Sequence, residues 1–436
     1  MTAWRNLLKG SYRRFQMQVV HQWILPRVFT SARVEQSARQ MDTLFTDPGV
    51  GEFKGASILE RVWFHAASVG ELETLAPIIF SLVQRGSESQ RPQVIVTILS
   101  ESAEGALRHL VQDVKDPKSI IFAGYSPWEG QWKRVFEWLK PTLFVTAKYE
   151  AWPDLWVSLQ ELNIPLGIVS ARDRKSLRIA RKMCQWMNGK IPKLILFPVN
   201  EADQVNLNAI FPEAQTHVVG EPRWERVFAR AQQGVSRVAS LVTAAQLLPR
   251  PWAVLGSVWM EDLKFLVPNL REMQGTLWIV PHQIDDSNLQ EIESFLSQHS
   301  LSAVRTRGTD VLPEGIRCVL VNEMGFLSEL YSVAEWVWVG GGFGDGIHST
   351  IEPAFRGVPI GGGAQGSDRF SEISELTQTG QFTLVRNRAE LQIWLQRVES
   401  QIKDHGLREH WVEQAHKRLG ATQKILEALE KFQWSW

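Results

Sequence analysis

The chain has few cysteines, no net charge and no long apolar run, and each absence removes a class of protein. Only two cysteines occur in 436 residues, Cys184 and Cys318, and no Cys-x-x-Cys spacing indicates a zinc or redox site. Lys plus Arg and Asp plus Glu both number 47, so the overall charge does not point to a nucleic-acid partner. No apolar run is long enough to span a bilayer, and no cleavable signal pattern is present. A reduced, cytosolic compartment is the simplest interpretation.

The N-terminal stretch is nevertheless unusual. Residues 1–28 contain five cations (Arg5, Lys9, Arg13, Arg14 and Arg27) and no acid, and the first acid of the chain is Glu35. Their apolar residues can form one face of a helix, and a basic amphipathic helix of this kind lies in the headgroup layer of a membrane. A helix packed on its own domain is the alternative. These residues alone do not decide between the two.

From residue 61 onward, short β-rich runs alternate with stretches of helical periodicity. Near-continuous apolar strands such as "PQVIVTIL" and "TLWIVP" between such helices predict parallel sheets covered on both faces. The length favours two domains. We expect an N-terminal helical segment over residues 1–40, a first Rossmann-like domain over 41–235, and a second over 236–436 that includes the terminal helices. Two doubly wound domains of this kind bind ligands at a shared cleft, where the strands end.

The stretch "GGGFGDGIHSTIEPAFRGVPIGGG" holds nine glycines in 24 residues, from Gly340 to Gly363. It is typical of a strand, a loop and a helix that begins at Ser349 or Thr350, where exposed N–H groups would bind a phosphate and Glu352 would accept hydrogen bonds from a ribose. The stretch fits neither a Walker A loop nor the dinucleotide-binding fingerprint. A purely structural glycine loop is the alternative.

Other candidates follow strands, and each has an ordinary structural explanation. Glu71 follows "FHAASVG" and can act as a base or as a helix cap. Lys148 and Glu150 precede Trp152-Pro153 and can bind substrate or form a surface ion pair. Arg223, after "VVGEP", is suited to a carboxylate or a phosphate. His282 follows another strand end, where a lone histidine is usually structural.

Nine stretches in this order resemble the 3-deoxy-D-manno-octulosonic acid (Kdo) transferases, which have the two-domain GT-B glycosyltransferase fold. The resemblance covers roughly residues 60 to 385. It is carried by "HAASVGE", "KYEAWPD", "SARDRKS", "GEPRWERV", "GSVWMED", "VPHQ", "NEMGFLSELY", "GGGFGDGIHSTIEP" and "RFSEI". It also favours the membrane interpretation of the N-terminus.

The resemblance implies an activity and its partners. It implies inverting, metal-independent transfer of Kdo from CMP-Kdo to a lipid A precursor, a step of lipopolysaccharide biosynthesis in Gram-negative bacteria, with no cofactor. The expected location is the cytoplasmic face of the inner membrane, peripheral or anchored by the N-terminal helix. The expected partners are the CMP-sugar donor, the lipid A precursor and the membrane surface, with no nucleic acid.

The resemblance also implies the site. Glu71 matches the family's general base, and Lys148 and Arg223 complete the expected catalytic set. Residues 281–282, 324–326 and 349–352 match CMP-contacting segments. The expected substrate-binding residues are Ser68, Gly70, Glu150, Pro281, His282, Met324, Gly325, Phe326, Gly342, His348, Ser349, Thr350, Ile351 and Glu352, with no metal ligand among them.

Two departures from the family pattern keep other functions open. Lys148 stands where much of the family has a carboxylate assigned to transition-state stabilisation, and Arg223 stands where a lysine is common. One alternative is another GT-B enzyme, either a nucleotide-sugar epimerase or a transferase with a different donor. The other is a non-catalytic sugar-nucleotide-binding membrane protein, against which the retained Glu71 argues.

Overall fold

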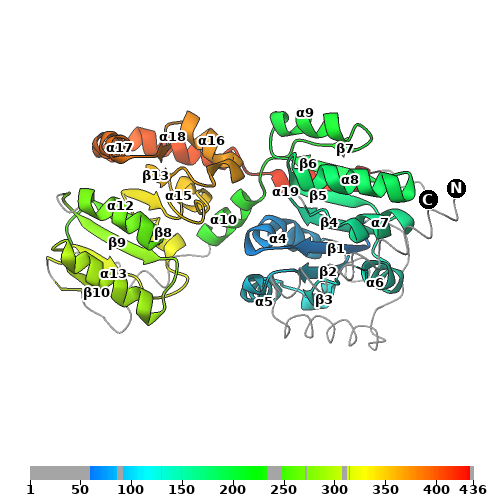
Figure 1. Ribbon diagram of the computed structural model, residues 1–436, viewed down its shortest axis with the longest axis horizontal. Helices are drawn as coiled ribbons and strands as arrows, with labels where there is room; N and C mark the ends of the chain where they lie inside the picture. Colours follow the sequence, from blue (N-terminus) through cyan, green and yellow to red (C-terminus); the bar gives the residue numbers. More distant parts are fainter. Residues whose placement is uncertain are drawn as a thin grey trace. The chain divides into compact units, whose positions relative to one another are not determined.

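The computed structural model describes residues 59–432, except 86–91, 129, 149, 233–242, 244, 246–247, 271–272, 307–311 and 314. The chain divides into two compact units, Met1–Arg226 with Gly420–Trp436, and Val227–Leu419. Figure 1 shows an α/β arrangement in each unit. The expected N-terminal helix over residues 1–40 lies outside the described residues, and the expected shared cleft stays a prediction.

The first unit holds a seven-stranded sheet of order β3-β2-β1-β4-β5-β6-β7, and all its pairings are parallel. Its strands are β1 (Arg61–Ala66), β2 (Gln93–Ile98), β3 (Ile120–Tyr125), β4 (Leu143–Ala147), β5 (Leu166–Ala171), β6 (Leu194–Pro198) and β7 (Gln215–Thr216). Its helices are α4 (Val69–Val83), α5 (Glu104–Asp113), α6 (Trp132–Leu139), α7 (Pro153–Glu161), α8 (Lys175–Asn188), α9 (Glu201–Ile210) and α19 (Ala421–Lys431), and α10 (Arg223–Gln232) begins there.

The second unit repeats this plan with the order β10-β11-β9-β8-β12-β13-β14, again all parallel. Its strands are β8 (Trp252–Val258), β9 (Thr276–Pro281), β10 (Ala303–Arg305), β11 (Cys318–Leu320), β12 (Trp336–Val339), β13 (Ile360–Gly363) and β14 (Phe382–Val385). Its helices are α12 (Met260–Leu270), α13 (Asp286–Gln298), α14 (Leu327–Leu330), α15 (Ile351–Phe355), α16 (Ser371–Gln378), α17 (Arg388–Gln401) and α18 (His405–His416).

The first sheet has a core on each face, as continuous apolar strands require. Within β1, Val62 and Phe64 pack in one buried cluster, whereas Trp63 packs in the other. Helix α19 belongs to the first of these cores, where Ile425 and Leu429 are buried. The expected assignment of residues 236–436 to the second domain therefore needs correction. The chain returns to the first unit at Gly420, because the apolar face of α19 is buried there.

The topology singles out one position in each sheet where ligands are expected. In the first unit β1 pairs with both β2 and β4. From the gap between β1 and β4, the strand order runs through β2 to β3 on one side and through β5 to β7 on the other, so the order reverses there. The gap between β8 and β12 has the same property in the second unit. Open α/β sheets bind ligands beyond the carboxyl ends of the strands at such switch points. The residues that follow β1, β4, β8 and β12 are therefore the first candidates for a ligand site.

The glycine-rich stretch is explained in large part by backbone packing. A Cβ on Gly342 would lie 2.5 Å from the backbone of Gly363, and one on Gly340 would lie 2.5 Å from the carbonyl oxygen of Ser257. Gly341 has a φ of 90°, a conformation that L side chains rarely adopt. The structural explanation thus accounts for these three glycines.

We expect Gly342→Ala to destabilise the protein by about 1–3 kcal/mol, because a rigid backbone segment occupies the space its Cβ needs. Gly344→Ala is the matched control, since the nearest atom to its Cβ is a flexible Glu261 oxygen at 3.9 Å. Urea unfolding of both variants measures the difference. Equal stability of the two would show that the contact between Gly342 and Gly363 does not constrain the loop.

Candidate functional site

Glu71 lies at the switch point of the first sheet, in the first turn of α4 directly after β1. The backbone N–H of Ala67 donates a hydrogen bond of 2.7 Å to Glu71 Oε2, which fixes the carboxylate at the start of the helix. The side chain is buried. Burial raises the pKa of Glu71, whereas the Ala67 N–H and the positive charge of Lys148 lower it. A carboxylate held in this way can accept a proton from a substrate hydroxyl.

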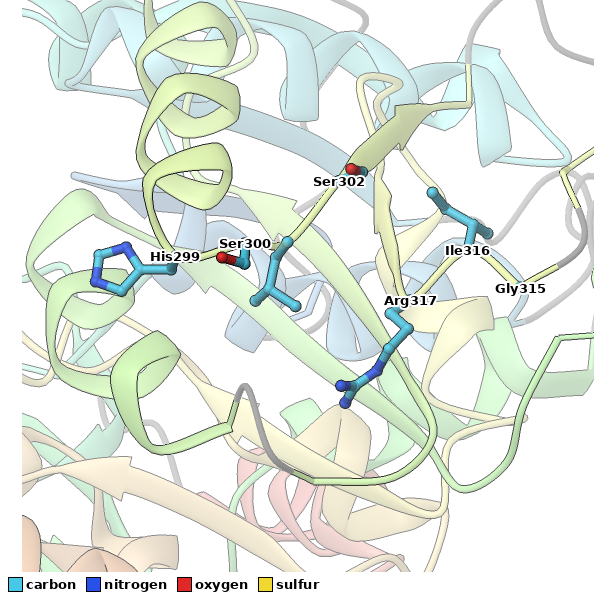
Figure 2. A pocket seen from close by; sticks show the side chains of 7 residues that line it. His299, Ser300, Ser302, Gly315, Ile316 and Arg317 are labelled. Carbon is cyan, nitrogen blue, oxygen red and sulfur yellow. The ribbon is translucent and has the colours of Figure 1, made fainter.

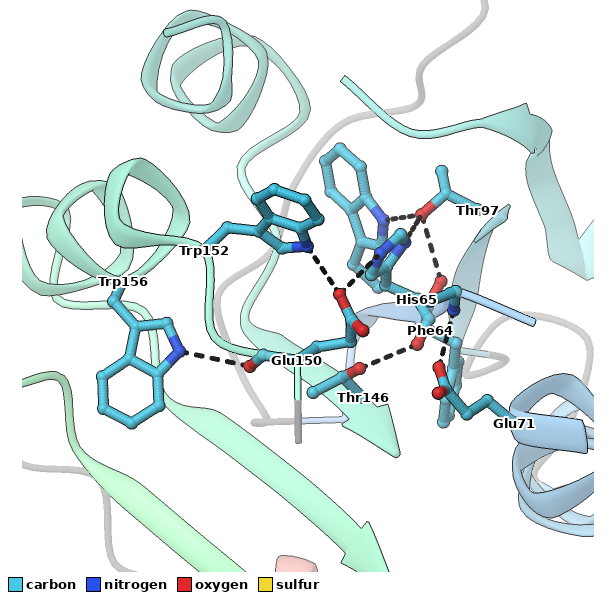
Figure 3. A network of polar contacts seen from close by, with 10 residues as sticks. Phe64, His65, Glu71, Thr97, Thr146, Glu150, Trp152 and Trp156 are labelled. Carbon is cyan, nitrogen blue, oxygen red and sulfur yellow. Dashed lines mark hydrogen bonds and ion pairs between the residues drawn. The ribbon is translucent and has the colours of Figure 1, made fainter. Parts of the chain in front are cut away.

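Glu150, which follows β4, is a second buried carboxylate at the same switch point (Figure 3). The indole N–H of Trp152 donates a hydrogen bond of 2.6 Å to Glu150 Oε2, and that oxygen lies 3.9 Å from His65 Nε2. Burial and the negative charge of Glu71 raise the pKa of Glu150 to about 7. The two buried carboxylates are therefore electrostatically linked, and Glu150 is partly protonated near neutral pH.

His65 lies within β1, and its ring is drawn between Glu150 and Thr97 in Figure 3. Its Nδ1 contacts the Thr97 hydroxyl at 3.0 Å. Complete burial lowers the pKa of His65 to about 3, so the ring is neutral at physiological pH. The neutral ring forms no ion pair with Glu150. The ring is therefore a polar but uncharged neighbour of that carboxylate.

Positive charge enters the site through Lys148 and Arg223. Lys148 directly follows β4 with a φ of 63°, and a Cβ on Gly70 would lie 3.9 Å from its Nζ. Arg223 Nη2 donates a hydrogen bond of 3.2 Å to Glu221 Oε2. Although burial opposes ionisation of Glu221, Arg223 and Lys148 together hold the pKa of this carboxyl below its usual value.

The structure therefore brings several of the expected residues together in the first unit. Ser68, Gly70 and Glu71 come from the start of α4, Lys148 and Glu150 follow β4, and Arg223 begins α10. The carboxyl groups of Glu71, Glu150 and Glu221 have different neighbours. Lys148 acts on Glu71 and Glu221, whereas Glu150 is held by Trp152. The net arrangement is a buried carboxylate pair beside two cations.

Three rings gather at the switch point of the second sheet. His282 stacks on Trp259 with ring centroids 4.5 Å apart, and on His348 with centroids 4.6 Å apart. The indole N–H of Trp259 donates a hydrogen bond of 3.4 Å to His348 Nε2. Burial and the neighbouring His282 lower the pKa of His348 to about 4, and burial also lowers that of His282. At neutral pH this stack is an uncharged aromatic surface.

Asp262 ties the glycine-rich loop to this stack. Its Oδ2 accepts hydrogen bonds from the backbone N–H of Gly341 at 2.8 Å and of Trp259 at 3.0 Å. Asp262 is buried at the start of α12, so the loop after β12 and the turn after β8 are fixed to each other. This carboxylate positions backbone and is not expected to meet a ligand.

Glu352 lies in the short helix α15 with its side chain about one quarter exposed, at 26%, and 4.0 Å from Arg230 Nη1. Burial and the negative charge of Glu352 raise the pKa of Tyr331 well above its ordinary value. Burial lowers the pKa of Arg356, and Glu352 opposes that shift. Glu352 thus lies among a buried hydroxyl and two arginines, and its carboxylate is partly accessible.

The remaining expected residues of the second unit differ in exposure. Ser349 and Gly325 are exposed, and Met324 is 74% exposed, so these three are accessible to a ligand. Thr350 and Ile351 are fully buried where α15 begins, and their expected contact with substrate stays a prediction. Pro281 and Gly342 are also buried, and Phe326 directly precedes α14 and is partly exposed.

A separate cavity lies at the opposite edge of the second sheet. It has a volume of about 490 Å³ and is lined by His299–Ser302 and Gly315–Arg317, which precede β10 and β11 (Figure 2). These are the amino ends of the strands, away from the switch point. Within the part of the chain described above, no group of three His, Cys, Asp or Glu side chains is arranged to hold a metal ion.

The sequence analysis did not select four residues that the structure places at these sites. His65 and Glu221 join the first cluster, and Trp259 and Asp262 join the second. Glu221 and Trp259 follow strands, so strand-end position was a usable signal for both. His65 lies inside an apolar strand and gave no such signal.

Comparison with known proteins identifies the relatives of this chain. A family model described as 3-deoxy-D-manno-octulosonic-acid transferase (kdotransferase) matches residues 28–226. A 3-deoxy-D-manno-octulosonic acid transferase of Chlamydophila psittaci is 26% identical over 318 residues, 68% of each chain. One of Haemophilus influenzae is 24% identical over 317 residues, 69% of this chain and 70% of its own. The chain is similar to Kdo transferases over these stretches.

The resemblance to the Kdo transferases is thus confirmed, and the relatives indicate a glycosyltransferase. The solved UDP-GlcNAc 2-epimerase from Methanocaldococcus jannaschii is similar in fold, with a TM-score of 0.53 at 15% identity over 79% of this chain and 93% of its own. That likeness concerns the fold alone. Together with the two parallel-sheet units, it confirms the predicted GT-B fold.

The pKa of Glu150 predicts how stability depends on pH. Its pKa is raised from 4.5 to about 7 by folding, so the folded chain binds more protons between these values. The stability that this group contributes is complete below pH 4.5 and is lost as the pH rises through 7. We expect Glu150→Gln, whose amide oxygen can still accept from Trp152, to reduce this loss by up to about 3 kcal/mol.

Urea unfolding of the parent and Glu150→Gln at pH 5 and pH 8 tests this expectation. The pKa of His65 is depressed to about 3, which removes stability as the pH falls below 6.5, but this contribution is common to both proteins. The same pH dependence in parent and variant would contradict the raised pKa of Glu150.

Proposed function

We propose that the protein transfers Kdo from CMP-Kdo to a lipid A precursor in lipopolysaccharide biosynthesis, with Glu71 as the general base. The observation that carries the proposal is the buried carboxylate of Glu71, held by the Ala67 N–H at the switch point of the first sheet beside Lys148. The similarity to Kdo transferases supports the choice of donor and acceptor.

The base acts on the acceptor. Glu71 Oε2 accepts the hydrogen bond from the Ala67 N–H, and Oε1 takes the proton of the acceptor hydroxyl. The acceptor oxygen then forms a bond to the anomeric carbon of Kdo while the bond from that carbon to the phosphate oxygen of CMP breaks. Because CMP leaves from the face opposite the attack, the reaction inverts the anomeric centre. The proton rests on Glu71, and the electron pair leaves with CMP.

Glu150 keeps the base charged. Two buried carboxylates disfavour each other's ionisation, and Glu150, with a pKa of about 7, holds the proton more readily. Glu71 has the Ala67 N–H and Lys148 to stabilise its negative charge. When Glu150 is protonated, Glu71 remains charged and can take the proton of the acceptor hydroxyl.

Lys148 and Arg223 supply the positive charge for the donor. A cation at 148 cannot act as the carboxylate common in the family does, but it attracts the carboxylate of Kdo or the departing phosphate. Arg223 shares this role through paired hydrogen bonds, with Glu221 fixing its guanidinium. These two side chains provide the charge, so the proposal requires neither a metal ion nor a cofactor.

The second unit binds the cytidine nucleotide. Ser349 and residues 324–326 are accessible, and Glu352 is placed to accept hydrogen bonds from the ribose. The neutral stack of Trp259, His282 and His348 borders the same switch point. Residues 281–282 and 349–352 therefore contribute backbone and accessible polar groups, while Thr350 and Ile351 support the loop from within.

The acceptor places the protein at the cytoplasmic face of the inner membrane. Among the residues described by the structure, no helix is long and apolar enough to cross a bilayer. The basic segment of residues 1–28 would bind the membrane surface as an interfacial helix. No nucleic acid is involved in the proposed activity.

The direct test incubates the protein with CMP-Kdo and a lipid A precursor and detects the product by mass. We expect transfer by the parent and a loss of about a hundredfold or more in Glu71→Gln, with CMP affinity and fold retained. Glu73→Gln, a change on the same helix at a residue that pairs with Arg226, is the matched control and should retain activity. Near-normal turnover by Glu71→Gln would exclude Glu71 as the base.

A further inference from the structure

Tyr331 directly follows α14 and is a buried residue whose hydroxyl has no partner in the chain. The residue is only 2% exposed. Its backbone N–H donates a hydrogen bond of 3.1 Å to the carbonyl of Leu327, but within the described part of the chain its hydroxyl makes no hydrogen bond. A buried hydroxyl normally has a partner, because leaving it unpaired costs free energy. The hydroxyl of Tyr331 therefore points to a group that the chain itself does not supply.

This hydroxyl lies against the switch point of the second sheet. A Cβ on Gly256, in β8, would lie 2.1 Å from Tyr331 Oη, so the strand leaves room for the hydroxyl only because it has a glycine there. The carbonyl of Gly256 also accepts a hydrogen bond of 2.9 Å from the N–H of Gly340, where the glycine-rich stretch begins. The hydroxyl is thus placed where β8 meets the loop after β12, and ligands are expected at that point of the sheet.

The hydroxyl is not sealed inside the core. Some buried polar atoms in the described residues lack both a partner and contact with solvent, and the hydroxyl oxygen of Thr350 is one of them. Tyr331 Oη is not among them although it also lacks a partner, so this oxygen is in contact with solvent. A ligand at the switch point can therefore reach it.

Glu352 is the charged neighbour of this hydroxyl. Burial and the negative charge of Glu352 raise the pKa of Tyr331 well above its ordinary value, so the phenol keeps its proton at neutral pH. The hydroxyl of Tyr331 can then donate a hydrogen bond, whereas the carboxylate of Glu352 can only accept one. No hydrogen bond joins the two side chains directly. A hydroxyl of a bound ligand, which both accepts and donates, can join them.

We propose that Tyr331 binds the ribose of the nucleotide. Its hydroxyl donates a hydrogen bond to one ribose hydroxyl oxygen, and that ribose hydroxyl donates its own hydrogen to Glu352. The inference rests on the proposed function in one respect, because Glu352 is the ribose acceptor there. Tyr331 lies between the two segments expected to contact the nucleotide, 324–326 and 349–352. Two hydrogen bonds through one ribose hydroxyl make the site select a ribonucleotide over the matching deoxyribonucleotide.

Calorimetric titration of the full chain with CMP tests the proposal. We expect Tyr331→Phe, which removes the hydroxyl and keeps the ring, to bind CMP about five- to tenfold more weakly than the parent. Titrations with 2′-deoxy-CMP and 3′-deoxy-CMP identify the ribose hydroxyl. One of these two should bind equally to parent and variant, because it lacks the hydroxyl that Tyr331 contacts. Tyr125→Phe is the matched control, since the hydroxyl of Tyr125 donates to Glu104 at 3.4 Å in the first unit, and it should bind CMP as the parent does.

Urea unfolding without nucleotide separates a binding role from a structural one. Because the hydroxyl of Tyr331 has no partner within the described chain, its removal breaks no hydrogen bond there. We therefore expect Tyr331→Phe to be at least as stable as the parent while it binds CMP more weakly. A hydroxyl that served the fold would give the opposite result, a loss of stability.

Three results would overturn the proposal. They are equal CMP affinity in the parent and Tyr331→Phe, an equal loss for CMP and for both deoxy analogues, and a clear loss of stability in Tyr331→Phe without nucleotide. The assay of Kdo transfer separates this inference from the proposed function. A parent that binds CMP through Tyr331 but forms no product would contradict the function and leave the ribose contact standing. Transfer by the parent together with unchanged CMP affinity in Tyr331→Phe would do the reverse.

Discussion

Two buried carboxylates at one switch point, Glu71 and Glu150, impose the constraint on which the rest of the first site depends. Desolvation disfavours the charge on each of them, and each disfavours the charge on the other. The surrounding groups divide the roles between them. The Ala67 N–H and Lys148 favour a charged Glu71, while Trp152 and the neutral His65 surround a Glu150 that holds a proton near neutral pH. This arrangement supports the proposed role of Glu71 as the general base.

The cations complete this charge pattern, and one of them, Lys148, stands where the resemblance described above implies a carboxylate. Lys148 has a positive φ directly after β4, and its ammonium would lie 3.9 Å from a Cβ on Gly70, an ordinary van der Waals distance. Its negative partners are Glu71 and Glu221, and Arg223 pairs with Glu221 as well. A lysine at this position is therefore compatible with the carboxylates around it. Under the proposed function, the positive charge of Lys148 would attract the carboxylate of Kdo or the departing phosphate.

The sequence predicted those features that depend on strand ends and periodicity. Apolar strands between helices predicted two parallel sheets, and residues that follow strands predicted that Glu71, Lys148 and Arg223 would meet. The return of α19 to the first unit could not be predicted, because its amphipathic pattern fits either core. His65 was missed because burial within an apolar strand hides a polar role. The role of the glycine-rich loop could not be decided from the sequence. Gly342 is required because its backbone packs against Gly363, and such packing leaves no periodic pattern in the sequence.

The central claim is that Glu71 and Glu150 share one proton near neutral pH, and NMR titration of the protein with ¹³C-labelled glutamate carboxyls tests it most directly. The account predicts one buried glutamate with a midpoint near 7, assigned to Glu150 by its loss in Glu150→Gln. In Glu71→Gln that midpoint should move towards lower pH, because the neighbouring negative charge that raises it is gone. Ordinary midpoints for every glutamate, or a midpoint that stays in place in Glu71→Gln, would contradict the account.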